Sequence, residues 1–62
     1  MNNKKFQDLS LNLINGNLSD YAAGIKKLRK KDLTQYLIYC YNILNESDFI
    51  HNLVKIDNIL HN

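Results

Sequence analysis

The sequence lacks the elements that usually hold very small domains together. Its 62 residues include a single cysteine, Cys40, so no disulfide can form within the chain. The only thiol and imidazole side chains that could bind zinc are those of Cys40, His51 and His61. No pair of them has zinc-finger spacing. A chain this short forms at most one domain and buries only about 60% of its unfolded surface. We therefore expect one helical domain over residues 1–62, without metal or other cofactor, stabilised by helix packing, self-association or a partner.

Proline and long apolar stretches are also missing. Without proline, no helix is interrupted from inside. The longest unbroken apolar run, Tyr36 to Tyr41, is far shorter than the ~20 residues that span a bilayer. Lys4 and Lys5 precede a stretch that Asp8 and Asn12 interrupt, unlike the unbroken apolar stretch of a secretory signal. Because a lone unpaired cysteine is typical of reducing compartments, we expect a cytoplasmic protein with no membrane partner.

The overall composition is that of a globular protein. Hydrophobic residues make up 45% of the chain and charged residues 23%, which argues against disorder. The formal net charge of +2 is too small to indicate nucleic-acid binding by itself. Asn, Lys, Ile and Tyr are abundant, and all four have AT-rich codons. This favours an origin in an AT-rich genome, such as that of a low-GC bacterium or its phage.

Apolar residues recur at helical spacing in four segments, of which the first runs roughly from Lys4 to Asn15. Phe6, Leu9 and Leu13 share one stripe of this segment at about 100° per residue. Gly16 follows directly, and glycine readily adopts the left-handed conformation that ends a helix. The pattern therefore predicts a first helix that stops at Gly16.

The second segment has Ser19 as its candidate N-cap, with Leu18 placed to staple onto Ala23. Gly24 lies beside the apolar stripe, where its low helix propensity costs up to about 1 kcal/mol. We interpret Gly24 as a place where another backbone approaches closely. The predicted apolar stripe consists of Tyr21, Ile25 and Leu28.

The third segment is predicted to begin at Leu33, because Asp32 and Gln35 have the spacing of a capping box. If this break is absent, the second and third segments fuse into one long helix. The third segment is the most apolar and is expected at the centre of the fold. Its predicted core face contains Leu33, Leu37, Cys40 and Leu44, widened by Tyr36, Tyr41 and Ile43.

The fourth segment has Ser47 as its candidate N-cap, followed by Asp48. Its predicted core stripe contains Phe49, Leu53, Ile56 and Leu60, with Ile50 at the edge. The sequence thus predicts an all-α fold, a compact bundle of four short helices with very short connections. The alternative is a bundle of three helices in which helices 2 and 3 are fused.

Residues capable of catalysis do not form a recognisable motif. Cys40 falls on a predicted core face, where a cysteine usually acts as a small hydrophobic residue. His51 falls opposite the core stripe and is expected to be solvated. Asp57 and His61 are four residues apart and could touch. A lone carboxylate–imidazole pair is weak evidence for a base or a metal, so we expect a protein that is not an enzyme.

A basic run is the most visible charged feature, and it has two interpretations. Cations near the end of a helix stabilise it and solubilise a small domain. Alternatively, they form a surface that contacts phosphates or an acidic partner. Base-specific reading by a helix-turn-helix is less favoured, because the third segment is too apolar for a recognition helix. The run comprises Lys26, Lys27, Arg29, Lys30 and Lys31.

Several apolar residues fall outside the predicted core faces. Isolated exposed apolar residues are normal, but a patch commonly marks an interface. Wider helix faces would explain them equally well. The candidates for partner binding are Ile38, Tyr39, Val54 and Ile59, and Leu11 is a further residue of this kind.

These features favour a small regulatory or inhibitory protein that binds a larger cytosolic protein stoichiometrically. In this hypothesis the surplus apolar residues anchor the partner and the lysines guide it electrostatically. A nucleic-acid-binding regulator that uses the basic run is the first alternative. A structural subunit that folds only within an assembly is the second. A homodimer would also bury the surplus apolar surface of the third and fourth segments.

Overall fold

The computed structural model describes residues 3–61, and over that range the chain forms four helices and no strand. They are α1 (Lys4–Ile14), α2 (Leu18–Lys27), α3 (Lys30–Ile43) and α4 (Glu46–Leu60). Between α2 and α3, Leu28 and Arg29 are extended, with ψ angles of 134° and 160°. The predicted all-helical fold of four helices is therefore confirmed, and the alternative with a fused second and third helix is wrong.

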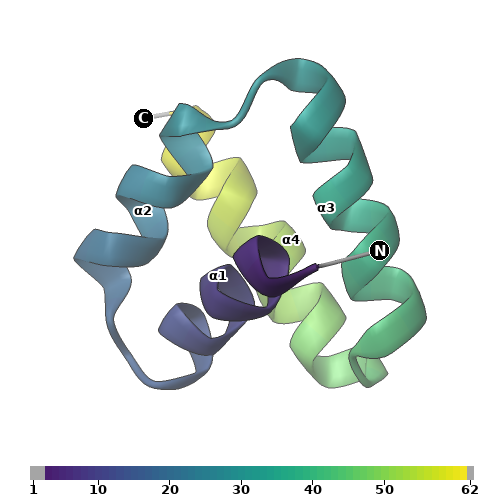
Figure 1. The fold of residues 1–62 in the computed structure, drawn as a ribbon. Coiled ribbons are helices and arrows are strands. Elements are labelled where there is room, and N and C mark those ends of the chain that lie inside the picture. The colour runs from purple at the N-terminus through teal and green to yellow at the C-terminus, as the bar shows by residue number, and fades with distance from the viewer. Residues whose placement is uncertain (1–2, 62) are drawn as a thin grey trace.

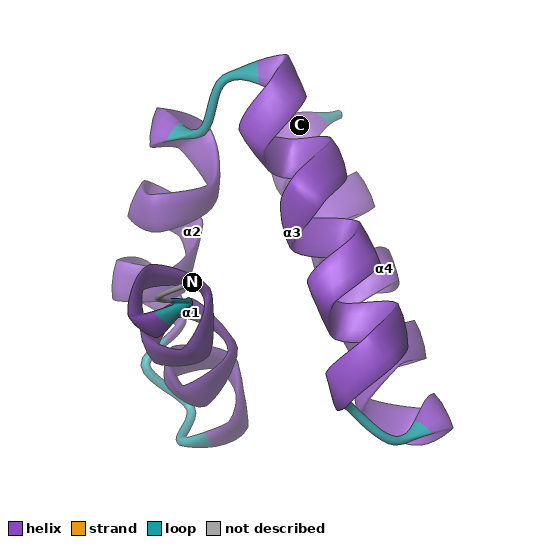
Figure 2. Cartoon of the chain, turned by 45° about the vertical axis from the view of Figure 1, so that its right-hand side comes forward, coloured by secondary structure: helices purple, strands orange, loops and turns teal. Residues whose placement is uncertain are grey.

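The helices are arranged as two hairpins, α1–α2 and α3–α4, which pack against each other. Figure 2 shows one hairpin on each side of the molecule. The neighbours α2 and α3 make the least contact of any helix pair and lie on opposite sides, with α1 and α4 between them (Figure 1). The connection of α2 to α3 lies at one end of the molecule and that of α3 to α4 at the other.

The predicted stop after the first helix is confirmed in detail. Gly16 has a positive φ of 79°, in the left-handed region that favours glycine. Its N–H donates to the carbonyl of Leu13 over 3.2 Å, and the N–H of Asn17 donates to the carbonyl of Asn12 over 2.8 Å. This pair of bonds is a Schellman motif, which satisfies carbonyls that the helix end would leave free.

The predicted starts of the second and third helices are wrong. After the turn at Gly16 the chain enters α2 at once, because the Asn17 carbonyl already accepts the N–H of Tyr21. Leu18 is therefore the first helical residue, and Ser19 lies inside the helix instead of capping it. Similarly, α3 begins at Lys30, so Asp32 belongs to its first turn. Neither of these helix starts carries a side-chain cap.

The start of α4 does carry a side-chain cap, but Asn45 provides it in place of the predicted Ser47. The Oδ1 of Asn45 accepts the N–H of Asp48 over 2.8 Å. Its Nδ2 lies 3.2 Å from the Oδ2 of Asp48, so the two side chains also bond to each other. Ser47 is exposed in the first turn of the helix.

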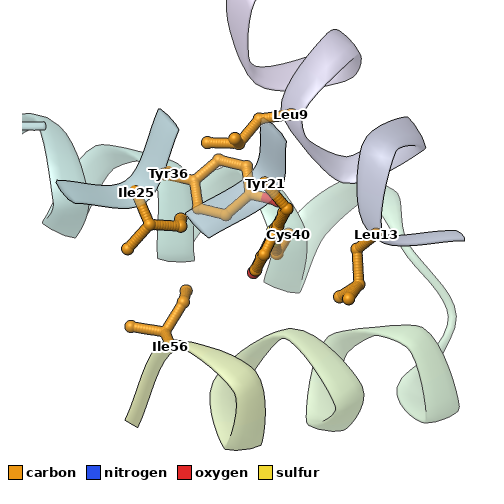
Figure 3. Packing of buried hydrophobic residues seen from close by; sticks show 7 residues of the cluster. All are labelled: Leu9, Leu13, Tyr21, Ile25, Tyr36, Cys40 and Ile56. Carbon is orange, nitrogen blue, oxygen red and sulfur yellow. The ribbon is translucent and has the colours of Figure 1, made fainter. Parts of the chain in front are cut away.

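Residues from all four helices fill a small core between the two hairpins. Figure 3 shows Leu9 and Leu13 of α1 on one side of this core and Ile56 of α4 on the other. A Cβ added at Gly24 would lie 2.6 Å from the Cδ1 of Leu9, so Gly24 does allow a close approach, although of a side chain. The buried hydrophobic residues are Leu9, Leu13, Tyr21, Ile25, Tyr36, Cys40 and Ile56.

The buried faces of α3 and α4 are rotated from the predicted ones. The polar Asn52 is fully buried at the centre of the α4 face, so a wheel drawn through apolar residues alone misplaces that centre. On α3 the face turns toward Tyr39, which packs on Phe6 of α1. As a consequence, four residues predicted in the core are exposed: Tyr41, Ile43, Leu53 and Leu60. Two residues predicted outside it, Tyr39 and Ile59, are instead half-buried and packed against it.

Candidate functional site

Cys40 is the only thiol of the chain and lies fully inside the core, as predicted. Burial raises the pKa of the Cys40 thiol above its ordinary value, because the thiolate would lose its hydration. The thiolate is the reactive form of cysteine. The position therefore suits a packing residue that is protonated at neutral pH.

A buried polar cluster that the sequence analysis missed joins α2, α3 and α4. The hydroxyls of Tyr21 and Tyr36 both donate to the Oδ1 of Asn52, over 2.8 Å and 2.7 Å. The Nδ2 of Asn52 donates to the carbonyl of Asp48 over 2.9 Å. No buried side-chain polar atom in the described part of the chain lacks a partner. The cluster is thus satisfied internally, which is the property of a structural network.

Burial also governs the ionisation of this cluster. Loss of hydration raises the pKa of both Tyr21 and Tyr36 well above the ordinary value. The hydroxyls therefore remain protonated donors at neutral pH. One signal in the sequence could have indicated the cluster, since Asn52 stands at helical spacing between Phe49 and Ile56 within an apolar stripe.

The predicted contact between Asp57 and His61 is confirmed and lies on the surface. The Nδ1 of His61 is 2.7 Å from the Oδ1 of Asp57, and the two side chains are 75% and 70% exposed. An exposed pair of this kind contributes little to stability. Within residues 3–61 no group of three or more His, Cys, Asp or Glu side chains could hold a metal ion. His51 is exposed, as expected.

The five predicted basic residues form one exposed surface around the connection of α2 to α3. This basic surface consists of Lys26, Lys27, Arg29, Lys30 and Lys31, and every one of them is exposed. Within the described residues, none of the five has a carboxylate at ion-pair distance. The rest of the sequence contains three cations against six carboxylates, so positive charge is concentrated here.

Helix stabilisation accounts for only two of these five cations. Lys26 and Lys27 occupy the last turn of α2, where the helix dipole favours positive charge. Arg29, Lys30 and Lys31 stand at the start of α3, where the dipole opposes it. Stabilisation of a helix end was expected for the whole run, and the break at Leu28 and Arg29 removes that explanation for three residues.

Exposed apolar residues gather at the opposite end of α3, around its connection to α4. Tyr41 is 72% exposed, and its ring meets the ring of Phe49 edge to face, with centroids 5.6 Å apart. Together with Leu44 and Ile50 they line an open groove whose polar rim is Asn42 and Glu46. We call Tyr41, Leu44, Phe49 and Ile50 the hairpin surface.

The predicted apolar binding residues are not brought together: two are exposed but do not line this groove, and two are packed against the core. Ile38 stands one helical turn before Tyr41 and is 49% exposed, and Val54 stands one turn after Ile50 and is 53% exposed. Tyr39 and Ile59 are packed against the core instead. The hairpin surface itself was not predicted, because three of its members had been assigned to core faces and Ile50 to the edge of one.

Residues 3–61 contain no helix long and apolar enough to cross a membrane. Comparison with protein-family models, with curated proteins and with solved structures found nothing that matches this chain.

Proposed function

We propose that this chain is a small, non-enzymatic regulatory or inhibitory protein that binds a larger protein stoichiometrically through the hairpin surface. The observation that supports this proposal is the 72% exposure of Tyr41 on an apolar groove. Removal of apolar surface from water yields roughly 25 cal/mol per Å². A partner that covers this groove would therefore gain free energy that the isolated fold does not use.

The composition of the surface suits a protein partner. Interface energies are dominated by a few central aromatic anchors surrounded by residues that exclude water. Tyr41 and Phe49 are the aromatic residues here, with Leu44 and Ile50 beside them. Asn42 and Glu46 supply the polar rim that a reversible interface usually has.

The experiment compares two matched double variants as bait in a pull-down that is read by mass spectrometry. Tyr41→Ser/Ile50→Ser alters the hairpin surface. Leu11→Ser/Ile14→Ser replaces two residues of α1 that are 42% and 51% exposed. All four side chains are exposed, so both variants should keep the circular dichroism of the wild type. We expect one protein captured near one-to-one by the wild type and the α1 variant, and lost with the hairpin variant.

Equal capture by both double variants would overturn the proposal. Size-exclusion chromatography with light scattering tests self-association on the same samples. A wild-type dimer that becomes monomeric in the hairpin variant would assign the surface to a second copy of this chain. That result would also contradict binding of a larger protein.

A further inference from the structure

We infer that the basic surface binds the phosphate backbone of a nucleic acid without reading its bases. This site is separate from the hairpin surface. The two surfaces lie at opposite ends of α3 (Figure 1). Between Lys30 and Tyr41 the helix rises roughly 17 Å at 1.5 Å per residue.

That separation makes the basic surface a poor electrostatic guide for docking at the hairpin surface. Physiological salt screens exposed charges over about 8 Å. Cations two screening lengths away therefore contribute little to an encounter at Tyr41. A function of the basic surface requires a ligand that contacts it directly.

The crowding of the five cations is also unfavourable for the fold, although Lys26 and Lys27 suit the end of α2. They repel one another within six consecutive positions, and no carboxylate in residues 3–61 pairs with them. Three of them oppose the dipole of α3. An anionic ligand would remove both penalties, so the arrangement favours bound anions over a bare surface.

The chemistry of the surface favours phosphates over an acidic protein. Four of the five cations are lysines, which protein–protein interfaces use sparingly. Lysine binds phosphate as a point charge. The apolar residue within this stretch, Leu28, is half-buried against the core and offers no anchor. Sequence-independent nucleic-acid binding needs only the cations.

Reading of bases is not expected from this arrangement. The helices α2 and α3 make little contact with each other, unlike the packed helices of a helix-turn-helix. Thr34, the first exposed polar residue after the basic surface, donates its hydroxyl to the carbonyl of Lys30. The contacts should therefore be with phosphates alone.

The test is fluorescence anisotropy with labelled 20-nucleotide DNA of mixed sequence, as duplex and as single strand. Between 50 and 200 mM NaCl, three to five phosphate contacts should weaken duplex binding by roughly 40- to 500-fold. Lys30→Gln/Lys31→Gln should lower the slope of log affinity against log salt by about two. Lys5→Gln/Lys55→Gln has the same net charge and should lose much less affinity.

Three outcomes would overturn the inference: no binding at 50 mM NaCl, a flat salt response, or equal losses in the two charge-matched variants. Displacement of DNA by polyglutamate at equal charge concentration would instead indicate an acidic protein as the ligand, and would also overturn it. The hairpin variant Tyr41→Ser/Ile50→Ser should bind DNA like the wild type. Failure here is thus distinguishable from failure of the proposed protein interaction.

Discussion

The hydroxyl of Tyr36 donates to the Oδ1 of Asn52 over 2.7 Å, and neither side chain has surface exposed to water. The same oxygen accepts the hydroxyl of Tyr21. A single amide therefore satisfies two buried donors, and its removal has a larger effect than the loss of either donor.

Replacement of Asn52 by Ala should remove most of the free energy of unfolding of this domain. Two buried hydroxyls would lose their acceptor, at about 1–3 kcal/mol each. A domain of this size rarely has more than about 3–5 kcal/mol in total. We expect Asn52→Ala to be largely unfolded at 25 °C by circular dichroism.

Tyr21→Phe should lose only about 1 kcal/mol in urea unfolding, because Tyr36 still pairs with Asn52. Equal losses from both substitutions would contradict the shared acceptor.

The stability of the fold should fall in alkaline solution. Burial raises the pKa of Tyr21, Tyr36 and Cys40 in the folded state. A group whose pKa is raised in the folded state contributes its full stabilisation below the unfolded-state pKa. This stabilisation is lost as the pH rises above the unfolded-state pKa toward the folded-state pKa. The loss should begin near pH 8.5 to 9 for the thiol and near pH 10 for the phenols. In this range each group lowers the free energy of unfolding by about 1.4 kcal/mol per pH unit, until its folded-state pKa is reached.

Urea midpoints measured at pH 7, 9, 10 and 11 check this dependence. Tyr36→Phe removes one of the titrating groups, so its midpoint should decline less steeply above pH 10. A wild-type midpoint that is constant from pH 7 to 11 would show that the three groups are accessible to water in the folded state.

The N-cap of α4 allows a comparison between two neighbouring polar residues. Asn45 accepts the N–H of Asp48, so Asn45→Ala should destabilise the fold by about 1 kcal/mol. Ser47 makes no such bond and lies within the first turn, where alanine has the better helix propensity. Ser47→Ala should therefore leave the thermal midpoint unchanged or raise it slightly. The reverse order of effects would place the cap at Ser47.

The close approach at Gly24 can be tested by adding a methyl group. Alanine would gain up to about 1 kcal/mol of helix propensity, but its Cβ would lie 2.6 Å from the Cδ1 of Leu9. Leu9 is itself buried, so its displacement costs about 1–3 kcal/mol. We expect Gly24→Ala to be destabilised by about 0.5–2 kcal/mol in urea unfolding. In a Leu9→Ala background the same change should become neutral or stabilising, and an unchanged cost would exclude the contact with Leu9.

The features that local chemistry determines were the ones that sequence reasoning could predict. Gly16 ends α1 because glycine reaches a positive φ without strain, whatever packs nearby. Cys40 was placed in the core by the periodicity of α3, and the structure agrees. The number of helices was also predicted correctly, although the capping residues on which the second and third breaks rested, Asp32 and Ser47, do not cap a helix.

The helix starts could not be predicted in the same way. A cap is worth only about 1 kcal/mol, and Asn45 and Ser47 are both good capping residues two positions apart. Tertiary packing decides between them. The same limit applies to the candidate surfaces, because their exposure depends on the rotation of α3 and α4. Asn52 is buried at the centre of the α4 face, and a wheel that counts only apolar residues as core leaves it out, although its place between Phe49 and Ile56 is visible in the sequence.

The hydrogen bond from Tyr21 to Asn52 spans 31 residues and links the two hairpins. Contacts between distant parts of a chain require a large loop to close and so tend to form after local ones. The Asn52 amide finds both of its donors only when the two hairpins meet, because Tyr21 belongs to one hairpin and Tyr36 to the other. We therefore expect assembly of the polar cluster to coincide with their docking, so that Asn52 leaves water late in folding.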